Sequence, residues 1–135
     1  MTFTVTPIGH VRSSLADPAA APRQPDEGAP PATLVIDDAY VTGLDGVGVG
    51  ANLLVLTWLH QGRRDVLTTR PRNDPDRPEQ GVFSTRSPDR PNPIGLHRVR
   101  VVAVDGGAIG VDALEAVDGT PVLDLKPVLG DVAER

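Results

Sequence analysis

The chain has 135 residues, which is enough for one domain around a single hydrophobic core, and its four aromatic residues leave that core to aliphatic side chains. It contains no cysteine, which excludes disulfides, thiolate nucleophiles and thiolate-ligated zinc. The three histidines are far apart in the sequence, so no metal site is expected, and a net charge of −5 argues against a uniformly basic nucleic-acid-binding protein.

The beginning of the sequence lacks a basic segment followed by an apolar run, and no apolar stretch reaches membrane-spanning length. We therefore expect a soluble cytoplasmic protein without membrane contact. Taken in order, Thr2 to Val5 alternate polar and apolar residues, which predicts a half-buried strand. Pro7 to Ser13 predict a second extended piece, residues 14–31 a long loop, and Thr33 to Ile36 a further strand.

A glycine-rich run, Gly43 to Gly50, superficially matches a dinucleotide-binding loop. That motif requires a preceding strand and a helix that opens directly from the glycines, so that a phosphate can lie at the helix N-terminus. Here the glycines lead into Asn52 to His60, a short apolar and β-branched run that favours a buried strand. We therefore reject the nucleotide-binding interpretation.

The chain is organised around the loop between Gly81 and Leu96, GVFSTRSPDRPNPIGL. Prolines at 88, 91 and 93 fix their own φ angles and keep the preceding residues extended, which predicts a stiff loop that holds Arg86 and Arg90 at set positions. Val82 and Phe83 are expected to form the strand that enters the loop, and residues 94–96 the strand that leaves it. Before it, residues 66–72 predict a strand and residues 73–80 a polar loop.

Charge is concentrated around this loop. Residues 61–100 hold nine arginines and five acidic residues, a local net charge of +4, whereas the rest of the chain has a net charge of −9. A basic face on an acidic body suits local contact with phosphate groups. The alternative is that the arginines pair with neighbouring aspartates on a solvated surface.

The remaining sequence predicts strands over residues 98–104 and 108–113, joined by an Asp-Gly-Gly hairpin turn. A second tight turn at residues 118–120 leads into Pro121 to Pro127, in which Asp124 and Lys126 lie on one face. From the residues alone this pair reads as an exposed ion pair on an edge strand. Many short strands, Gly/Pro turns and no convincing amphipathic helix predict an all-β sandwich or barrel.

The central loop, together with PIGHVRS, PRQ, WLH, RPR and DGTPVLDLKP, closely resembles the signature of the TsaA-like family over Pro7 to Pro127. The resemblance implies a single small antiparallel β-barrel, a homodimer, and an S-adenosylmethionine-dependent methyltransferase. Its best-known members methylate N6 of a threonylcarbamoylated adenosine beside the tRNA anticodon, so the resemblance implies tRNA, through its anticodon loop, as the partner.

Carried over residue by residue, the resemblance implies a methyl-donor site formed by Pro22, Arg23, Gln24, His60, Gln61, Arg86, Leu96, Asp118, Gly119, Thr120 and Pro121. An amine that attacks the donor methyl group must lose a proton, and Asp124 is the candidate base, with Asp118 as the second choice. Lys126 would orient Asp124 or contact a carboxylate of substrate or donor. Arg90 and Asn92 would contact the base or a phosphate.

Two features distinguish this chain from the family pattern. Val128 follows the last proline where the family usually has tyrosine, and we expect a single domain over residues 1–135 without the additional C-terminal domain of many bacterial members. Two alternatives therefore remain open. One is a methyltransferase of the same fold that acts on a small molecule or another RNA, and the other is a non-catalytic module that binds S-adenosylmethionine or RNA.

Overall fold

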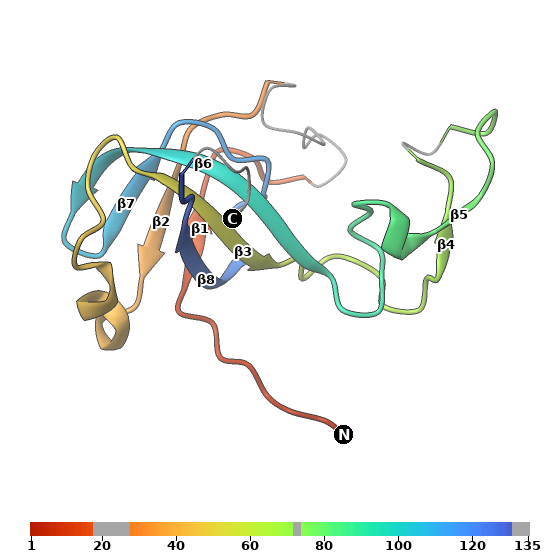
Figure 1. The fold of residues 1–135 in the computed structure, drawn as a ribbon, viewed down its shortest axis with the longest axis horizontal. Coiled ribbons are helices and arrows are strands. Elements are labelled where there is room, and N and C mark those ends of the chain that lie inside the picture. The colour runs from red at the N-terminus through yellow and green to blue at the C-terminus, as the bar shows by residue number, and fades with distance from the viewer. Residues whose placement is uncertain (18–27, 72–73, 131–135) are drawn as a thin grey trace.

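The computed structural model describes residues 1–17, 28–71 and 74–130, and six of its strands form a closed antiparallel barrel. Around the barrel the order is β1, β2, β7, β6, β3 and β8 (Figure 1). The strand bounds are β1 Gly9–Arg12, β2 Ala32–Ile36, β3 Asn52–Trp58, β6 Ile94–Asp105, β7 Ala108–Val111 and β8 Pro121–Pro127. The predicted all-β fold and small antiparallel barrel are confirmed.

The barrel interior is filled by aliphatic side chains that alternate with exposed ones along each strand. In β6 every second residue from Gly95 to Val101 is buried, and the residues between them are exposed. Core side chains come from all six strands and from the loop after β7, and include Val11, Leu34, Val55, Val101, Ile109, Leu114 and Val122. A core without a large aromatic side chain agrees with the composition.

Two glycine turns close the sheet. The predicted hairpin joins β6 to β7, with Asp105 paired to Ala108 and a left-handed Gly106 at φ 58°. The second turn has Gly119 at φ 82° and leads into β8. Strand β8 pairs with β1 on one side and β3 on the other, which completes the ring.

The glycine-rich run before β3 adopts a structure unlike that of a nucleotide-binding loop. A 3-10 helix, η3 (Asp38–Leu44), ends within it, and Gly46 and Gly50 adopt positive φ angles in the turns that follow. The chain then enters β3 directly, without an α-helix. The rejection of a dinucleotide-binding loop is therefore confirmed.

Residues 59–71 and 74–93 lie outside the barrel, between β3 and β6, and belong to an arm that projects from one side (Figure 1). The strand expected over residues 66–72 is reduced to β4 (Thr68–Thr69), which pairs with β5 (Gln80–Gly81). The strand expected at Val82 and Phe83 is wrong, because these residues begin the 3-10 helix η5 (Val82–Ser84). Hydroxyl groups explain this: Ser84 Oγ donates to Gly81 O at 2.8 Å, and Thr85 Oγ1 donates to Val82 O at 3.0 Å.

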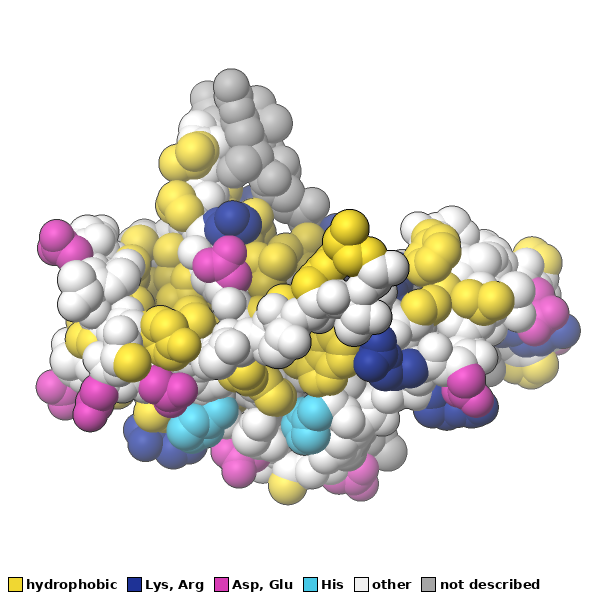
Figure 2. All heavy atoms as spheres, turned by 90° about the horizontal axis from the view of Figure 1, so that it is seen from below, with side chains coloured by type: hydrophobic (Ala, Val, Ile, Leu, Met, Phe, Trp, Pro, Cys, Tyr) yellow, Lys and Arg dark blue, Asp and Glu magenta, His cyan; other side chains and the backbone are white. Residues whose placement is uncertain are grey.

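The strand expected at Thr2 to Val5 is also wrong. Residues 1–8 contain no strand, and the segment before Ile8 extends away from the barrel, with Phe3 79% and Val5 58% exposed (Figure 1). The alternating pattern has no partner here because β1 and β8 already close the ring and leave no free edge. Figure 2, seen from the side of the N-terminus, shows hydrophobic side chains standing out on this face. Among the described residues, no helix has the length and hydrophobicity needed to span a membrane.

Candidate functional site: the cleft between arm and barrel

A cleft of about 1340 Å³ lies between the arm and the barrel. It brings together several residues that the sequence placed in the site: His60 and Gln61 after β3, Leu96 on β6, Thr120 before β8, and from the central loop Arg86, Arg90 and Asn92. Residues as far apart in the sequence as His60 and Thr120 therefore share one surface. Pro22, Arg23 and Gln24 lie outside the described residues. Among the remaining candidates, those that do not line the cleft are Asp118, Gly119, Pro121, Asp124 and Lys126.

The central loop is held against the barrel by Arg64. Its Nε donates to Pro91 O at 2.7 Å, and its Nη2 donates to the side-chain oxygen of Asn92 at 3.0 Å. The same guanidinium lies 5.1 Å from the ring centre of Trp58 at the end of β3. Trp58 and Arg64 thus connect the barrel to the loop that carries the predicted site residues.

Arg90 fixes the loop from within. Its Nη1 donates to the carbonyl oxygens of Thr85 and Ser87, each at 3.0 Å, and its backbone N–H donates to Arg63 O at 2.9 Å. A guanidinium has five N–H donors, so further donors are left for a ligand in the cleft. The predicted stiffness of the loop therefore comes from arginine hydrogen bonds as well as from proline.

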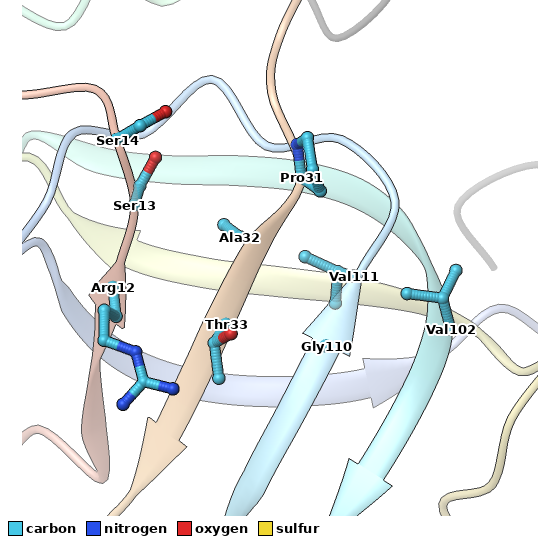
Figure 3. Close-up of a pocket in the computed structure, with 9 residues that line it drawn as sticks. All are labelled: Arg12, Ser13, Ser14, Pro31, Ala32, Thr33, Val102, Gly110 and Val111. Carbon is cyan, nitrogen blue, oxygen red and sulfur yellow. The ribbon is translucent and has the colours of Figure 1, made fainter.

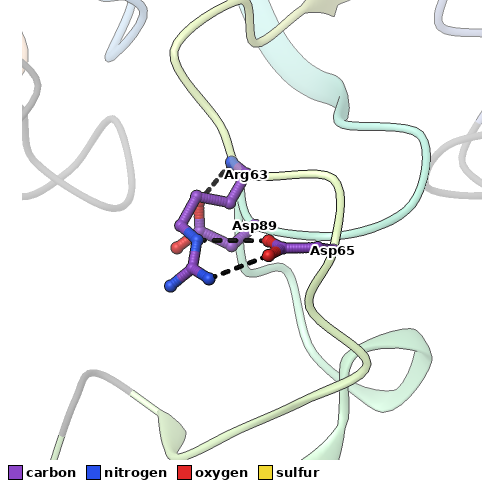
Figure 4. Close-up of polar contacts among 3 residues, drawn as sticks. All are labelled: Arg63, Asp65 and Asp89. Atoms are coloured by element: carbon purple, nitrogen blue, oxygen red, sulfur yellow. Dashed lines mark hydrogen bonds and ion pairs between the residues drawn. The ribbon is translucent and has the colours of Figure 1, made fainter.

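Arg63 illustrates the alternative that arginines pair with neighbouring aspartates on the surface. Its Nη2 lies 3.0 Å from Asp65 Oδ2 on an exposed surface, and its backbone N–H donates to Asp89 Oδ1 at 2.8 Å (Figure 4). The hydrogen bond from Arg63 lowers the pKa of the Asp65 carboxyl below its ordinary value, and the same bond raises the pKa of Arg63. Some arginines of the basic segment are therefore paired on the surface.

Four arginines nevertheless line the cleft, namely Arg70, Arg77, Arg86 and Arg90, against the carboxylates of Asp89 and Glu115. Apolar side chains complete the walls, with Ile94 47% and Leu96 36% exposed. The combination of cationic donors and apolar surface suits a ligand that has an anionic group and an apolar or aromatic body.

Three buried polar side chains, those of Thr57, His97 and Glu115, are linked by hydrogen bonds in the barrel wall of the cleft, and we call them the polar chain. Thr57 Oγ1 lies 2.7 Å from His97 Nε2, and His97 Nδ1 lies 2.6 Å from Glu115 Oε1. The side chains of His97 and Glu115 are only 5% and 13% exposed. Glu115 Oε2 is buried and has no hydrogen-bond partner among the residues that the structure describes. An unsatisfied buried acceptor costs about 1–3 kcal/mol, and more when it is charged.

The sequence alone indicates no role for these polar side chains, since His97 is one of three widely separated histidines. A signal was present in β6, where His97 occupies the inward register shared with Val99 and Val101. A polar residue at an inward position requires a partner, and that partner comes from the loop after β7.

The turn that leads into β8 lies beside the first loop of the chain. Asp118 Oδ1 accepts the backbone N–H of Ser13 at 2.9 Å, and Asp118 N–H donates to Leu15 O at 2.6 Å. Thr120 is 1% exposed, and its hydroxyl donates to Val117 O at 2.7 Å. The turn is thereby tied to residues 13–15, a few positions before Pro22.

Asp124 and Lys126 lie elsewhere, on the outward face of β8. Lys126 Nζ is 3.3 Å from Asp124 Oδ2, and the two side chains are 62% and 51% exposed. The expected ion pair is confirmed, although both neighbours of β8 are occupied, so the strand is not an edge strand. The role of Asp124 as a base stays a prediction.

A second, smaller hollow of about 450 Å³ lies over β1, β2 and β7 (Figure 3). Arg12 is the one charged side chain among its lining residues, and none of the predicted site residues contributes to it. No group of three or more histidine, aspartate or glutamate side chains capable of holding a metal ion occurs in residues 1–17, 28–71 and 74–130.

Comparison with known proteins gives consistent matches. The family described as "tRNA-methyltransferase O N-terminal domain" matches residues 10–133. A "Probable S-adenosyl-L-methionine-binding protein" of Methanothermobacter thermautotrophicus is 38% identical over 98% of this chain and 94% of its own length. An "S-adenosyl-L-methionine-binding protein" of Archaeoglobus fulgidus is 39% identical over 89% of this chain and 85% of its own length.

Among solved structures, TrmO from Pseudomonas aeruginosa superposes with a TM-score of 0.78 at 33% identity. The match covers 100% of this chain and 61% of that protein, so the chain spans about three fifths of the solved relative. Both the sequence and the fold are therefore shared over almost the whole chain.

Proposed function

Since the chain belongs to the tRNA-methyltransferase O N-terminal domain family, we propose that it is an S-adenosylmethionine-dependent methyltransferase. Its proposed substrate is N6 of threonylcarbamoyladenosine next to the tRNA anticodon. The names of the relatives support the methyl donor, and the family description supports tRNA. The observation that carries the proposal is the cleft, which collects His60, Gln61, Arg86, Leu96 and Thr120 from four separate segments.

The chemistry of the cleft fits S-adenosylmethionine. Arg86 would bind the carboxylate of the donor through its planar pair of N–H groups, and Leu96 would pack against the apolar part of the donor. His60 and Gln61, which also line the cleft, would supply further polar contacts. Pro22, Arg23, Gln24 and the turn from Asp118 to Pro121 complete the proposed donor site.

The chain's main contribution to the reaction is position. A sulfonium methyl group is already activated for transfer, so holding the acceptor nitrogen in line with the methyl carbon supplies much of the rate. The loop fixed by Arg64 and Arg90 provides a rigid frame for this alignment. In the proposal from resemblance, Asp124 or Asp118 accepts the proton of the acceptor, and Lys126 orients Asp124.

The same loop offers a surface for RNA. Arg90 retains N–H donors beyond its two loop bonds, and Asn92 is held beside it by Arg64, so both can contact a base or phosphate at the rim of the cleft. We propose that the chain forms a homodimer in which a second copy covers the cleft.

Donor binding is tested first by calorimetric titration of S-adenosylmethionine. We expect stoichiometric binding to the unmodified protein, strong weakening in Arg86→Ala, and no change in Arg98→Ala, which removes an exposed arginine on β6 outside the cleft. Absence of binding to the unmodified protein would refute the donor site. Equal weakening in both variants would show that Arg86 has no specific role.

Methyl transfer is tested with donor labelled in the methyl group and with tRNA that carries threonylcarbamoyladenosine, followed by mass analysis of the nucleosides. Label on that nucleoside supports the proposed substrate. Label on another RNA or on a small molecule supports the first alternative. Donor binding without any methylated product supports the non-catalytic module, an alternative that the name of the Archaeoglobus relative favours.

A further inference from the structure

We propose that Glu115 accepts the hydrogen of the acceptor nitrogen during methyl transfer, and that His97 and Thr57 are positioning residues for it. The inference rests on the proposed methyltransferase function and deepens it. Asp124 was the candidate base from the sequence, and the geometry points to a different carboxylate. Three observations carry the assignment: the place of Glu115 in the cleft, the hydrogen bonds that fix it, and its unpartnered oxygen.

The first observation concerns which carboxylates the cleft contains. Among the described residues that line it, only Asp89 and Glu115 carry a carboxylate. Asp89 Oδ1 is engaged by the backbone N–H of Arg63 at 2.8 Å, where it stabilises the central loop. Asp124 lies outside the cleft, is about half exposed and is paired with Lys126. Of the two carboxylates in the cleft, Glu115 is therefore the one that does not hold the central loop in place.

The second observation is the chain of hydrogen bonds behind Glu115. When His97 Nδ1–H donates to Glu115 Oε1, Nε2 is the acceptor and receives the Thr57 hydroxyl hydrogen. Thr57 is 0% exposed, and it lies in β3, which pairs with β6 on one side and β8 on the other. Its backbone is therefore held in place by two neighbouring strands. The carboxylate orientation is thus set by His97 and, behind it, by Thr57, which does not line the cleft.

Gly95 makes room for this arrangement. A side chain at that position would place its Cβ less than 3 Å from both the Thr57 hydroxyl and His97 Nε2. Gly95 and Glu115 both line the cleft, on either side of His97. The absence of a side chain therefore keeps the polar chain intact where the cleft meets the barrel.

The third observation is Glu115 Oε2, which is buried and has no partner among the described residues. Since Oε1 is occupied by His97, Oε2 is the oxygen left for a hydrogen-bond donor. It is buried in this structure, so the proposal requires the Glu115 carboxylate to turn toward the cleft when the acceptor binds. An amine N–H suits it because ionised carboxylates are acceptors only.

The step balances without a further reactant. The nitrogen lone pair forms a bond to the methyl carbon while the bond from carbon to sulfur breaks and its electron pair returns to sulfur. The nitrogen proton moves to Glu115 Oε2, which leaves a neutral methylated nitrogen and a neutral carboxylic acid. The acid then releases its proton to solvent when the product leaves the cleft.

The test compares Glu115→Gln with Glu115→Asp. Gln keeps an oxygen for His97 but cannot accept a proton, so we expect kcat to fall about 100-fold or more while the Kd for S-adenosylhomocysteine changes by less than about twofold. Asp restores a carboxylate and is expected to recover at least about tenfold of the lost kcat. Glu79→Gln removes a carboxylate of the arm outside the cleft, and its kcat should match that of the unmodified protein.

A readout without turnover follows the proton on His97 Nδ1 by NMR. With S-adenosylhomocysteine bound, adding unmethylated acceptor should shift this resonance in the unmodified protein and in Glu79→Gln. A kcat for Glu115→Gln within about threefold of normal would overturn the assignment, as would a large loss of donor affinity, which would place Glu115 in donor binding. An unmodified protein that neither binds the donor nor transfers methyl overturns the proposed function as well, so the two failures are distinguishable.

Discussion

Replacing Thr57 by valine should destabilise the barrel through the loss of a single hydrogen bond. Thr57 Oγ1 lies 2.7 Å from His97 Nε2, in a site where Thr57 is 0% and His97 4% exposed. Valine keeps the branched shape and nearly the same volume, so no cavity opens. It also removes the hydroxyl, and for this reason threonine and valine are not interchangeable in a core.

The magnitude depends on what His97 loses. Its Nε2 would be buried without a partner, and an unsatisfied buried group costs about 1–3 kcal/mol. For a domain of this size, each kcal/mol lowers Tm by roughly 3–6 °C. Water is not expected to compensate fully, because Thr57 is fully buried and His97 almost fully buried.

The assay is urea denaturation followed by circular dichroism, with Thr33→Val as the matched control. Thr33 lies in β2, is partly exposed and makes no side-chain hydrogen bond to another described residue, so its replacement should change the free energy of unfolding by less than about 0.5 kcal/mol. A Thr57→Val protein as stable as the control would refute the reasoning and show that the polar chain does not stabilise the fold. Equal m values in all proteins are needed for the comparison.

Two further predictions concern the same region and the arm. Gly95→Ala should cost about 1–3 kcal/mol of unfolding free energy, because its Cβ would press on His97, whereas Gly81→Ala, which meets nothing within 4 Å, should be nearly neutral in the same urea assay. Asp65 has a pKa lowered below the ordinary 3.8 by Arg63, so its contribution to stability is present above that value and is lost as pH falls through the lowered pKa. The stability difference between the unmodified protein and Asp65→Asn should therefore shrink in acid. It should also shrink in high salt, because the ion pair of Arg63 and Asp65 is exposed. A stability difference that does not change with pH would contradict this prediction.

The sequence predicted the barrel because its strands are encoded locally. The Asp-Gly-Gly turn, the buried run into Trp58 and the strict alternation of β6 each specify a strand without knowledge of its partner. Prediction failed where pairing decides the structure. Thr2 to Val5 have a strand pattern but no free edge, and Val82 lies next to hydroxyl side chains that favour a turn.

The candidate site was predicted in part for a related reason. Proline and arginine in the central loop mark a rigid cationic surface, and the structure brings Arg86 and Arg90 into the cleft. The partner of His97 could not be found in this way, because Glu115 comes from a loop after the next strand and its pairing depends on the closed barrel. The number of residues between His97 and Glu115 in the sequence does not show how close their side chains lie in the folded barrel.

The polar chain in the barrel wall is hard to explain as a device for stability alone. Hydrophobic residues of similar volume at the positions of Thr57, His97 and Glu115 would fill the same space without burying an unpaired carboxylate oxygen, and such replacements are often neutral or stabilising. The polar chain also extends toward the cleft, whereas the rest of the barrel core is aliphatic. Local rules of folding are most often broken at functional sites, where a cost in stability is retained for chemistry. The buried, unpaired carboxylate oxygen of Glu115 is therefore best explained by the ligand that the cleft receives.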